Sequence, residues 1–306
     1  MLTVAVIGHT GFVGKAVTQA LIDRGIRVLG FARKALAGTA AGPPKLFRAM
    51  SCDVTKFDKV RRVLDESPWP IDVAILLAAC VRIVEESPQG VRELFETNVG
   101  GVLNVLEAMK RHHGARVIFT SSMAVYGRPN VLPVSEQHPR EPQSLYGLTK
   151  MQAEDMVSWF GRHYGFATTV LRLPGLYGGG RWDGTVFRFV QQAMMGEAVR
   201  INLSQPVVWD VLHVDDAVSA ICAAVTGPAS GHRVFNLDQG EPVELVNVAH
   251  RIVKWLGSKS PVIVEGSAES VEFQLDITQA RNHLGFKPVP LAQRVLEMAA
   301  KMESRP

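Results

Sequence analysis

The first half of the chain alternates short apolar runs with longer segments whose apolar residues recur at helical spacing. Parallel strands need crossover helices and so become buried on both faces. The alternation therefore predicts an α/β fold, a doubly wound Rossmann-type parallel sheet covered by helices on both faces. The strands expected are residues 2–7, 27–31, 46–49, 73–77, 116–120 and 168–173, with helices at 13–24, 57–66 and 91–110.

After Leu173 the pattern loosens, which indicates a smaller C-terminal α/β domain for the substrate. The dinucleotide-binding domain is expected to comprise 1–173 and about 208–228, and the substrate domain about 174–207 and 229–306. Residues 35–44 are small enough to form a loop. Later helices are expected at 187–195, directly after Asp215-Asp216, at 245–256 and at 291–302, with strands at 233–237 and 262–264.

Charge and cysteine usage exclude several classes of protein. The 33 Lys and Arg residues against 29 Asp and Glu residues give a net charge of only +4, and the basic residues are scattered. This disfavours nucleic-acid binding. The three cysteines lack metal-ligand spacing, so neither a metal site nor a disulfide is expected. The N-terminus reads as a first strand, and the longest apolar run, 73–81, is too short to span a bilayer, so we expect a cytoplasmic protein with no membrane partner.

A glycine motif, Gly8-His-Thr-Gly11-Phe-Val-Gly14, stands directly between the first strand and the first helix. Glycines let the backbone turn tightly and approach a pyrophosphate, whose charge is stabilised by the amides and dipole of the helix start. The position predicts dinucleotide binding. The alternative is a glycine-rich turn that only packs helix on strand.

The end of the second strand bears on the choice of cofactor. NAD sites usually carry an acid about 20 residues past the glycines, to bind the ribose 2′-hydroxyl. This chain has Ala32 there, followed by Arg33 and Lys34. Arginine binds phosphate through paired charge-assisted hydrogen bonds, so NADP is the preferred cofactor and NAD the alternative. Arg33 could instead stack on the adenine or point to solvent.

Tyr146 and Lys150 are four residues apart and share one face of any helix that includes both. A nearby ammonium favours the phenolate and makes the tyrosine a usable proton donor and acceptor. Taken alone, the spacing also fits a solvated helix face.

The ordered motifs resemble the extended short-chain dehydrogenase/reductase family, of the NAD-dependent epimerase/dehydratase type that modifies nucleotide sugars. The resemblance covers nearly the whole chain. The motifs that carry it are the glycine motif, Cys52-Asp-Val54, Leu77-Ala-Ala79, Asn98, Phe119-Thr-Ser-Ser122-Met-Ala-Val-Tyr-Gly127, Pro133-Val-Ser-Glu136, Tyr146-Gly-Leu-Thr-Lys150, Leu171-Arg172 to Tyr177-Gly178, and Leu212-His-Val-Asp-Asp216.

The resemblance implies roles for individual residues. Ser122 would hydrogen-bond the substrate oxygen, Tyr146 would move the proton, and Lys150 would bind the nicotinamide ribose and tune Tyr146. A strand-end cap is the alternative for Ser122, and bridging of helix to strand is the alternative for Asn98. The residues expected to bind the cofactor are Gly8, Thr10, Gly11, Phe12, Val13, Gly14, Arg33, Lys34, Asp53, Val54, Leu77, Ala78, Ala79, Asn98, Tyr146, Lys150 and Leu173.

Departures from the family pattern narrow the reaction. Met123 and Ala124 stand where sugar-nucleotide dehydratases carry acidic residues, so dehydration is disfavoured. Gly175 and Trp209 stand where epimerases often have an asparagine and an arginine for the diphosphate, which weakens a UDP-sugar 4-epimerase assignment. The other residues considered for the substrate are Arg181, Arg188 or Arg200 for a diphosphate, and Trp182 or Trp209 for stacking, with packing as the alternative for both tryptophans.

Three functional hypotheses are compatible with the sequence. The leading hypothesis is an NAD(P)-dependent oxidoreductase or epimerase that transfers a hydride at a carbinol or ketone carbon of a sugar, by 4-keto reduction or 4-epimerisation of a nucleotide sugar. The alternatives are an NADP-dependent reductase of a non-sugar ketone or aldehyde, and a non-catalytic cofactor sensor, which would typically lack the Tyr146 and Lys150 pair. We expect a homodimer, with 91–110 and 152–163 as candidate interface helices.

Overall fold

The computed structural model describes residues 1–34, 43–81, 87–112, 114–178, 181, 183–204, 207–228, 230–241, 243–268, 270–271 and 273–304. Most of the loop expected at 35–44 lies outside the described residues. The chain divides into two compact units, each described by itself below. The first unit comprises Met1–Arg128, Gln137–Arg172 and Val218–Phe235, and the second comprises Pro129–Glu136, Leu173–Ala217 and Asn236–Pro306.

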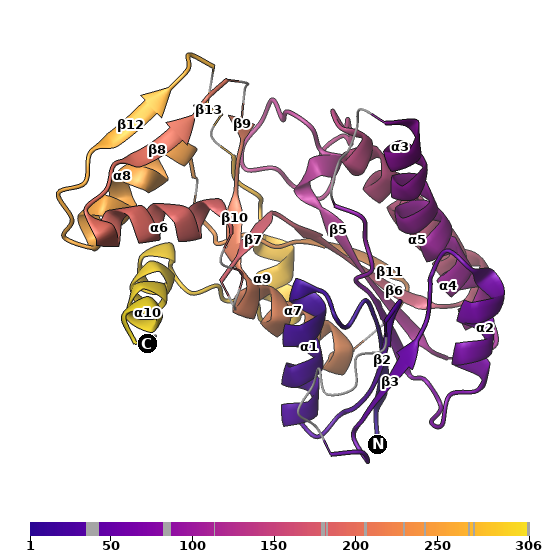
Figure 1. The fold of residues 1–306 in the computed structure, drawn as a ribbon. Helices are drawn as coiled ribbons and strands as arrows, with labels where there is room; N and C mark the ends of the chain where they lie inside the picture. Colours follow the sequence, from indigo (N-terminus) through magenta and orange to yellow (C-terminus); the bar gives the residue numbers. More distant parts are fainter. Residues whose placement is uncertain are drawn as a thin grey trace. The chain divides into compact units, whose positions relative to one another are not determined.

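A seven-stranded sheet with the order β11-β6-β5-β4-β1-β2-β3 forms the centre of the first unit (Figure 1). Strand β1 pairs in parallel with β2 and with β4, and the pairs β2–β3 and β4–β5 are also parallel. This arrangement confirms the expected doubly wound fold. The strands are β1 Thr3–Ile7, β2 Arg27–Ala32, β3 Phe47–Ser51, β4 Val73–Leu76, β5 Arg116–Ser122, β6 Ala167–Leu173 and β11 His232–Asn236.

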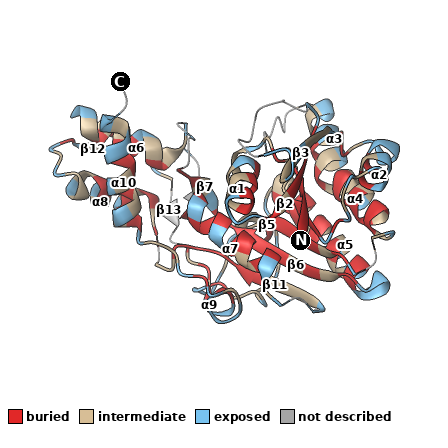
Figure 2. Cartoon of the chain, turned by 90° about the horizontal axis from the view of Figure 1, so that it is seen from below, coloured by how far each residue is buried: buried red, intermediate tan, exposed pale blue. Residues whose placement is uncertain are grey.

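Helices cover both faces of this sheet. Helices α1 (Phe12–Asp23) and α7 (Val214–Thr226) lie on one face, and α2 (Phe57–Asp65), α3 (Pro88–Phe95), α4 (Gly101–Met109) and α5 (Leu145–Tyr164) lie on the other (Figure 1). The central strands are buried along their length (Figure 2). Strand residues such as Phe119 and helix residues such as Leu106 and Val157 form one apolar core. This packing fixes the carboxyl ends of the parallel strands, where open α/β sheets bind their ligands.

The segment expected as one helix at 91–110 is interrupted by a π-helical turn, η1, at Glu96–Gly100. The extra residue in a π turn rotates its neighbours relative to a regular helix, and such turns are frequent at functional sites. Asn98 lies in this turn and is almost fully buried. Periodicity does not reveal such a turn, because the apolar pattern continues on either side of it.

The second unit has its own core and three two-stranded sheets. Strands β7 (Gly175–Tyr177) and β10 (Val211–His213), β8 (Val199–Asn202) and β12 (Val262–Glu265), and β9 (Val207–Val208) and β13 (Ser270–Val271) pair in parallel. Helices α6 (Thr185–Met195), α8 (Leu245–Trp255) and α10 (Leu291–Glu303) supply core residues such as Phe189, Val248 and Val295, and α9 spans Thr278–Leu284.

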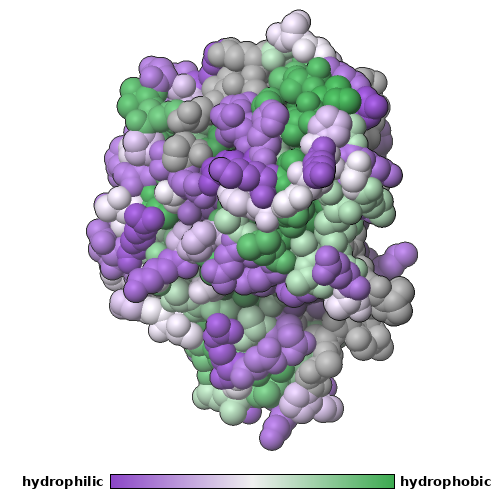
Figure 3. Space-filling model, turned by 90° about the vertical axis from the view of Figure 1, so that its left-hand side faces the viewer, coloured by the Kyte–Doolittle hydropathy of each residue, from purple (hydrophilic) through white to green (hydrophobic). Residues whose placement is uncertain are grey.

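Several elements differ from the expectation. The strand expected at 233–237 forms β11 and joins the sheet of the first unit. The short strands β7, β8, β9, β10 and β13 were not expected, because two to four residues are too few for a periodic signal. The seven-residue helix α9 was not expected either. On the face shown in Figure 3, hydrophobic and hydrophilic residues are interspersed. None of the described helices combines the length and apolar character that a membrane crossing requires.

Candidate functional site

The glycine motif forms a tight loop between β1 and α1. Gly8 has a φ of 97°, its amide donates to Phe31 O at 2.7 Å, and the amide of Gly11 donates to Gly8 O at 3.0 Å. A Cβ on Gly8 would lie 2.7 Å from the amide nitrogen of Ala78, and one on Gly14 would lie 2.1 Å from Gly8 O. A side chain at either position would clash with the backbone, so both positions require glycine. The loop lies close to the end of β4.

A hollow of about 480 Å³ opens beside this loop. Nine residues expected to bind the cofactor line it: Gly8, Thr10, Gly11, Arg33, Asp53, Val54, Leu77, Ala78 and Ala79. The lining comes from the carboxyl ends of β1, β2 and β4 and from the segment after β3, the edge at which open parallel sheets bind ligands. A hollow lined by a glycine loop at a helix start fits the pyrophosphate of a dinucleotide.

The other expected cofactor residues lie elsewhere. Phe12, Val13 and Gly14 form the first turn of α1, Lys34 follows β2, Leu173 ends β6, Asn98 lies in η1, and Tyr146 and Lys150 lie on α5. Their contact with a cofactor remains a prediction.

Sequence reasoning missed eight residues that line the hollow: Phe31, Ala32, Cys52, Thr55, Cys80, Glu93, Glu96 and Thr97. The first five lie within two positions of expected residues at the ends of strands. Extending the predicted site along these strand ends would therefore have included them. Glu93, Glu96 and Thr97 come from α3 and η1, for which the sequence carries no such signal.

His9 is a buried residue of the glycine motif that the sequence did not single out. Its ring packs near Phe47, with centroids 5.9 Å apart, and a Cβ on Gly30 would lie 2.7 Å from it. Burial lowers the pKa of His9, although an interaction with Phe31 O opposes this. His9 is therefore neutral and fills space between the loop, β2 and β3.

Asp53 lines the hollow just after the end of β3. Its Oδ1 accepts hydrogen bonds from Thr55 N at 3.0 Å and from Thr55 Oγ1 at 2.8 Å. Burial acts to raise the pKa of Asp53, but the bonds from Thr55 and the charges of Arg33 and Lys56 outweigh it, so the pKa is lowered. The side chain is an ionised acceptor, suited to an exocyclic amino group.

Ser122 ends β5 and caps the short 3₁₀ helix η2 (Met123–Val125), because its Oγ accepts a hydrogen bond from Ala124 N at 3.2 Å. The Ser122 side chain also lies near enough to Tyr146 to act on its pKa, which it lowers. The cap considered from sequence is therefore present. Met123 and Ala124 lie in this turn.

Helix α5 begins directly against the Ser122 turn. Ser144 caps its N-terminus by accepting from Gly147 N at 3.0 Å. A Cβ on Gly147 would lie 2.4 Å from Ala124 O, so only glycine permits the observed approach. The helical geometry places Tyr146 and Lys150 on one face, as the spacing predicts.

Burial shifts the pKa values of Tyr146 and Lys150 in opposite directions. In each case it favours the neutral form of the side chain. Burial raises the pKa of Tyr146 to about 12, while the nearby Ser122 side chain acts in the opposite direction. Burial lowers the pKa of Lys150 to about 8, while the carboxylate of Glu154 acts to raise it. Lys150 Nζ lies 4.4 Å from the centroid of the Phe119 ring. A buried phenol and a buried amine of this kind are typical of a proton-transfer site.

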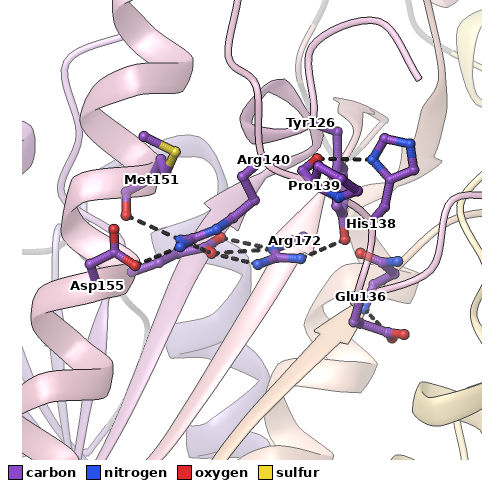
Figure 4. A network of polar contacts seen from close by, with 10 residues as sticks. Tyr126, Glu136, His138, Pro139, Arg140, Met151, Asp155 and Arg172 are labelled. Carbon is purple, nitrogen blue, oxygen red and sulfur yellow. Dashed lines mark hydrogen bonds and ion pairs between the residues drawn. The ribbon is translucent and has the colours of Figure 1, made fainter. Parts of the chain in front are cut away.

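Glu154, one turn after Lys150, is buried and pairs with Arg172 and Arg140. Both arginines are part of the polar network drawn in Figure 4. Arg172 Nη2 lies 2.7 Å from Glu154 Oε2, and Arg172 Nη1 donates to the Tyr126 hydroxyl at 2.6 Å. Arg140 bridges Glu154 at 3.2 Å and the exposed Asp155 at 2.7 Å. The network joins α5 to β6 and to the segment after η2, and so fixes the helix that carries Lys150.

Asn98 connects the hollow to α5. Its Oδ1 accepts from Cys80 N at 2.7 Å, and its Nδ2 donates to Cys80 O at 3.0 Å and to Thr149 Oγ1 at 3.1 Å. Thr149 Oγ1 in turn donates to Tyr146 O at 2.8 Å. The bridging considered from sequence is thus present. Through this chain of hydrogen bonds the lining residue Cys80 and the backbone of Tyr146 have fixed positions within the first unit.

The residues considered for the substrate beyond η2 belong to the second unit. Gly175 N donates to Asp210 O at 3.0 Å, Trp209 packs against the core of that unit, and Arg181 forms an ion pair with Asp183 at 2.9 Å. Trp182 lies outside the described residues. A role in substrate binding remains a prediction for all four.

Comparisons with known proteins agree with this geometry. A family model described as "NAD dependent epimerase/dehydratase family" matches residues 4–238. The UDP-glucuronate 4-epimerase 1 of Arabidopsis thaliana is 27% identical over 325 residues, which cover 94% of this chain and 73% of that protein. The UDP-glucose 4-epimerase of Corynebacterium glutamicum is 26% identical, with 92% of this chain and 90% of that protein covered.

Solved structures show the same fold. The UDP-glucose 4-epimerase of Thermotoga maritima, crystallised with UDP-glucose, has a TM-score of 0.82 and 25% identity over 99% of both chains. MoeE5, solved with UDP-glucuronic acid and NAD, has a TM-score of 0.80 and 25% identity over 98% of this chain and 99% of that chain.

Proposed function

The chain belongs to the NAD-dependent epimerase/dehydratase family, and from this premise we propose that it inverts the configuration at C4 of a UDP-activated hexose or hexuronic acid. The observation that carries the proposal is that α5 holds Tyr146 one helical turn from the buried Lys150 and beside Ser122 at the end of β5. The relatives named above act on UDP-sugars, which supports the substrate class.

The chemistry at C4 requires the removal and return of a proton on one oxygen. The nicotinamide, when bound, supplies the hydride acceptor and donor. Tyr146 takes the proton from the 4-hydroxyl and returns it to the ketone oxygen, while the Ser122 hydroxyl hydrogen-bonds that same oxygen. A positive charge on Lys150 would favour the phenolate and so oppose the burial that raises the pKa of Tyr146 to about 12. The glycine loop and Asp53 would hold the pyrophosphate and the adenine, respectively.

Inversion also requires that the ketone intermediate stay bound and turn its other face toward the nicotinamide. Only one acid/base centre is needed, because the same phenol serves both directions. Met123 and Ala124, next to Ser122, add no ionisable group. With Met123 and Ala124 beside Ser122, the site fits epimerisation better than dehydration, because dehydration needs further acid/base groups.

A second candidate is net reduction of a 4-keto sugar with an exchangeable NADP. It is favoured by one observation: Ala32 leaves the end of β2 without an acid, and Arg33 lines the hollow. Reduction of a non-sugar ketone or aldehyde is the further alternative. Cytoplasmic location stays a prediction.

The direct test incubates the purified protein with UDP-glucose, UDP-glucuronate or UDP-N-acetylglucosamine and resolves the products by chromatography. We expect the 4-epimer of one substrate at equilibrium, without added cofactor if nucleotide is retained. Incubation of the matching 4-keto sugar with NADPH tests the second candidate. Net consumption of NADPH with no epimer exchange would overturn the proposed function in favour of the reductase.

We also propose a homodimer built on α4 and α5 of the first unit. Leu103 is 39% exposed, Trp159 is 43% exposed and Tyr164 is 44% exposed, which leaves apolar side chains of both helices at the surface. Light scattering of the purified protein tests this, and Leu103→Asp should shift a dimer toward monomer. A monomeric wild type at micromolar concentration would refute it.

A further inference from the structure

The hydroxyl of Thr149 connects two parts of the site that are distant in the sequence. Its Oγ1 accepts a hydrogen bond from Asn98 Nδ2 at 3.1 Å and donates one to Tyr146 O at 2.8 Å. A hydroxyl has a single proton to donate, and here the carbonyl of Tyr146 receives it. Because Thr149 is 0% exposed, water does not compete for either bond, and the hydroxyl keeps one orientation.

Asn98 is fixed in turn by the wall of the dinucleotide hollow. Its amide group bonds both the N–H and the carbonyl of Cys80, which lines the hollow, as does Thr97 next to Asn98 in η1. The segment formed by α3 and η1 packs beside α5 (Figure 1). Two side chains, those of Asn98 and Thr149, therefore connect the wall of the hollow with the backbone of Tyr146.

The bond from Thr149 acts on the first turn of α5, because Tyr146 is the second residue of that helix. A threonine hydroxyl that bonds a carbonyl one turn earlier changes the local course of a helix. On the other side of the same turn, Gly147 lies so close to Ala124 O that a Cβ would come within 2.4 Å. Residues two apart on a helix point in roughly opposite directions. The turn that carries Tyr146 is therefore fixed from two sides.

Thr18 is a buried threonine that lacks such contacts. It lies on α1 and is 1% exposed, and its Oγ1 has no hydrogen-bond partner among the residues that the structure describes. A methyl group could replace that hydroxyl without the loss of a bond. Thr149, by contrast, uses its donor and one acceptor site, and its loss would also deprive the buried Asn98 amide of one partner.

We propose that Thr149 is a positioning residue, whose hydroxyl holds the backbone of Tyr146 in register with the wall of the dinucleotide hollow. Thr149 itself does not line the hollow, so it acts through Tyr146 and Asn98. Register matters because a displacement of about 1 Å at an acid/base group can cost about 10²-fold in rate. The proposal rests on the proposed function in taking Tyr146 as the group that moves the proton and a dinucleotide as the ligand of the hollow.

The kinetic test replaces Thr149 by valine, which keeps the shape of the side chain and removes the hydroxyl. For the UDP-sugar that the wild type epimerises, kcat should fall about 10–100-fold while KM changes less than about twofold. Thr149→Ser retains the hydroxyl and should restore most of the lost turnover. Thr18→Val, which removes a buried hydroxyl without a partner from the same unit, is the matched control and should leave kcat unchanged.

A second measurement does not depend on turnover. Amide hydrogen exchange is followed by mass spectrometry in residues 144–150 of the protein saturated with NADH. In Thr149→Val these amides should exchange about tenfold faster than in wild type, because a buried hydrogen bond of the first turn is lost. Exchange in α1 should stay the same, which separates a local effect from a general loss of stability. Thr149→Ala, which also lacks the hydroxyl and is a good helix former, carries the same expectation should the valine variant not fold.

Full turnover in Thr149→Val would overturn the proposal. Equal losses in Thr149→Val and Thr149→Ser would overturn it as well, because they would assign the effect to packing of the methyl group. A wild type that epimerises no UDP-sugar removes the proposed function. Exchange in residues 144–150, which requires only NADH, then still decides the role of the hydroxyl, and equal exchange in wild type and Thr149→Val refutes it.

Discussion

Ser122 lies beside Tyr146 and acts to lower the pKa of its phenol, although the two residues come from different elements of the first unit. The contact depends on how closely α5 approaches the turn after β5. Gly147 follows Tyr146, and any larger side chain there would lie 2.4 Å from Ala124 O. The local sequence Tyr-Gly therefore supplies both the phenol and the space that lets it reach the serine.

Replacing Tyr146 by phenylalanine removes the phenol oxygen and preserves the ring. We expect turnover of the UDP-sugar substrate to fall by about 10²–10⁴, the usual contribution of a positioned acid/base group. The dissociation constant of the cofactor should stay within about twofold, because the ring still fills the same space. Steady-state kinetics and nucleotide titration measure the two quantities.

Tyr164→Phe is the matched control for this substitution. Tyr164 ends the same helix, is 44% exposed and accepts a hydrogen bond from Lys110 at 3.4 Å. Its loss should leave turnover unchanged. Retained turnover in Tyr146→Phe would remove this residue from the proposed mechanism.

The sequence predicted the fold and the glycine loop because both depend on local patterns. Strands β1, β2 and β4 are continuous apolar runs, and Gly8 stands directly after the first of them. The spacing of Tyr146 and Lys150 likewise translates into one helical face. These features involve neighbours along the chain, or periodicities that a single sequence displays.

The features that the sequence could not predict depend on contacts between distant segments. The π turn at Asn98 is held by bonds to Cys80 and Thr149, which lie in other elements. Lys59 and Arg62 of α2 line a hollow together with Arg33, which is distant from them in the sequence. In the second unit, strands such as β9 contain two residues and are defined by their pairing partners.

Lys150 is expected to lower the stability of the cofactor-free protein. Its pKa falls from 10.5 to about 8 because burial penalises the charged amine. Between pH 8 and pH 10.5 the unfolded chain binds more protons at this residue, so its unfavourable contribution shrinks as pH rises through that range. At pH 7 the buried, charged Lys150 lowers the free energy of unfolding by about 3 kcal/mol. Lys150→Met should therefore raise the free energy of unfolding at pH 7 and abolish turnover.

Urea unfolding at pH 7 and pH 10 measures this effect. The gain from Lys150→Met should be larger at pH 7 than at pH 10. Lys110→Met, at an exposed lysine paired with Glu107, is the control and should show no gain at either pH. A Lys150→Met protein that is less stable than wild type at pH 7 would mean that the ammonium is well solvated or paired in solution.

Glu154→Gln is expected to be strongly destabilising. Glu154 and Arg172 are each 3% exposed, and removal of one partner leaves an uncompensated buried charge. Such losses cost about 3–5 kcal/mol. The substitution also removes the carboxylate that raises the pKa of Lys150, so the pH dependence of turnover should shift to lower pH. Urea unfolding and a pH–rate profile check the two effects.

Asp155→Asn provides the comparison for Glu154→Gln. Asp155 pairs with Arg140 from an exposed position, with 59% of its side chain accessible. Its loss should change the free energy of unfolding by less than about 0.5 kcal/mol. Equal effects of the two substitutions would show that the buried network contributes no more than a surface ion pair.

Asp210 and Asp238 form a buried carboxyl pair in the second unit, and they predict how its stability depends on pH. Burial and the charge of Asp238 raise the pKa of Asp210 well above its usual range, and burial raises the pKa of Asp238 to about 6. A group with a raised pKa in the folded protein stabilises it at low pH and loses that contribution as pH rises through the folded pKa. Stability should therefore decline from about pH 4 to above pH 6.

Asp210→Asn should flatten this decline. The amide oxygen can still accept from Val211 N, which bonds Asp210 Oδ1 at 2.6 Å, and the amide NH₂ replaces Oδ2, which has no partner within the described residues. Asp238 keeps its bonds from Gly240 N and Leu275 N. We expect a gain of about 1–2 kcal/mol at pH 8 and little change at pH 4, measured by urea unfolding. Asp183→Asn, at an exposed carboxylate, should leave the pH curve unchanged. Parallel curves for Asp210→Asn and wild type would show that Asp210 does not cause the decline.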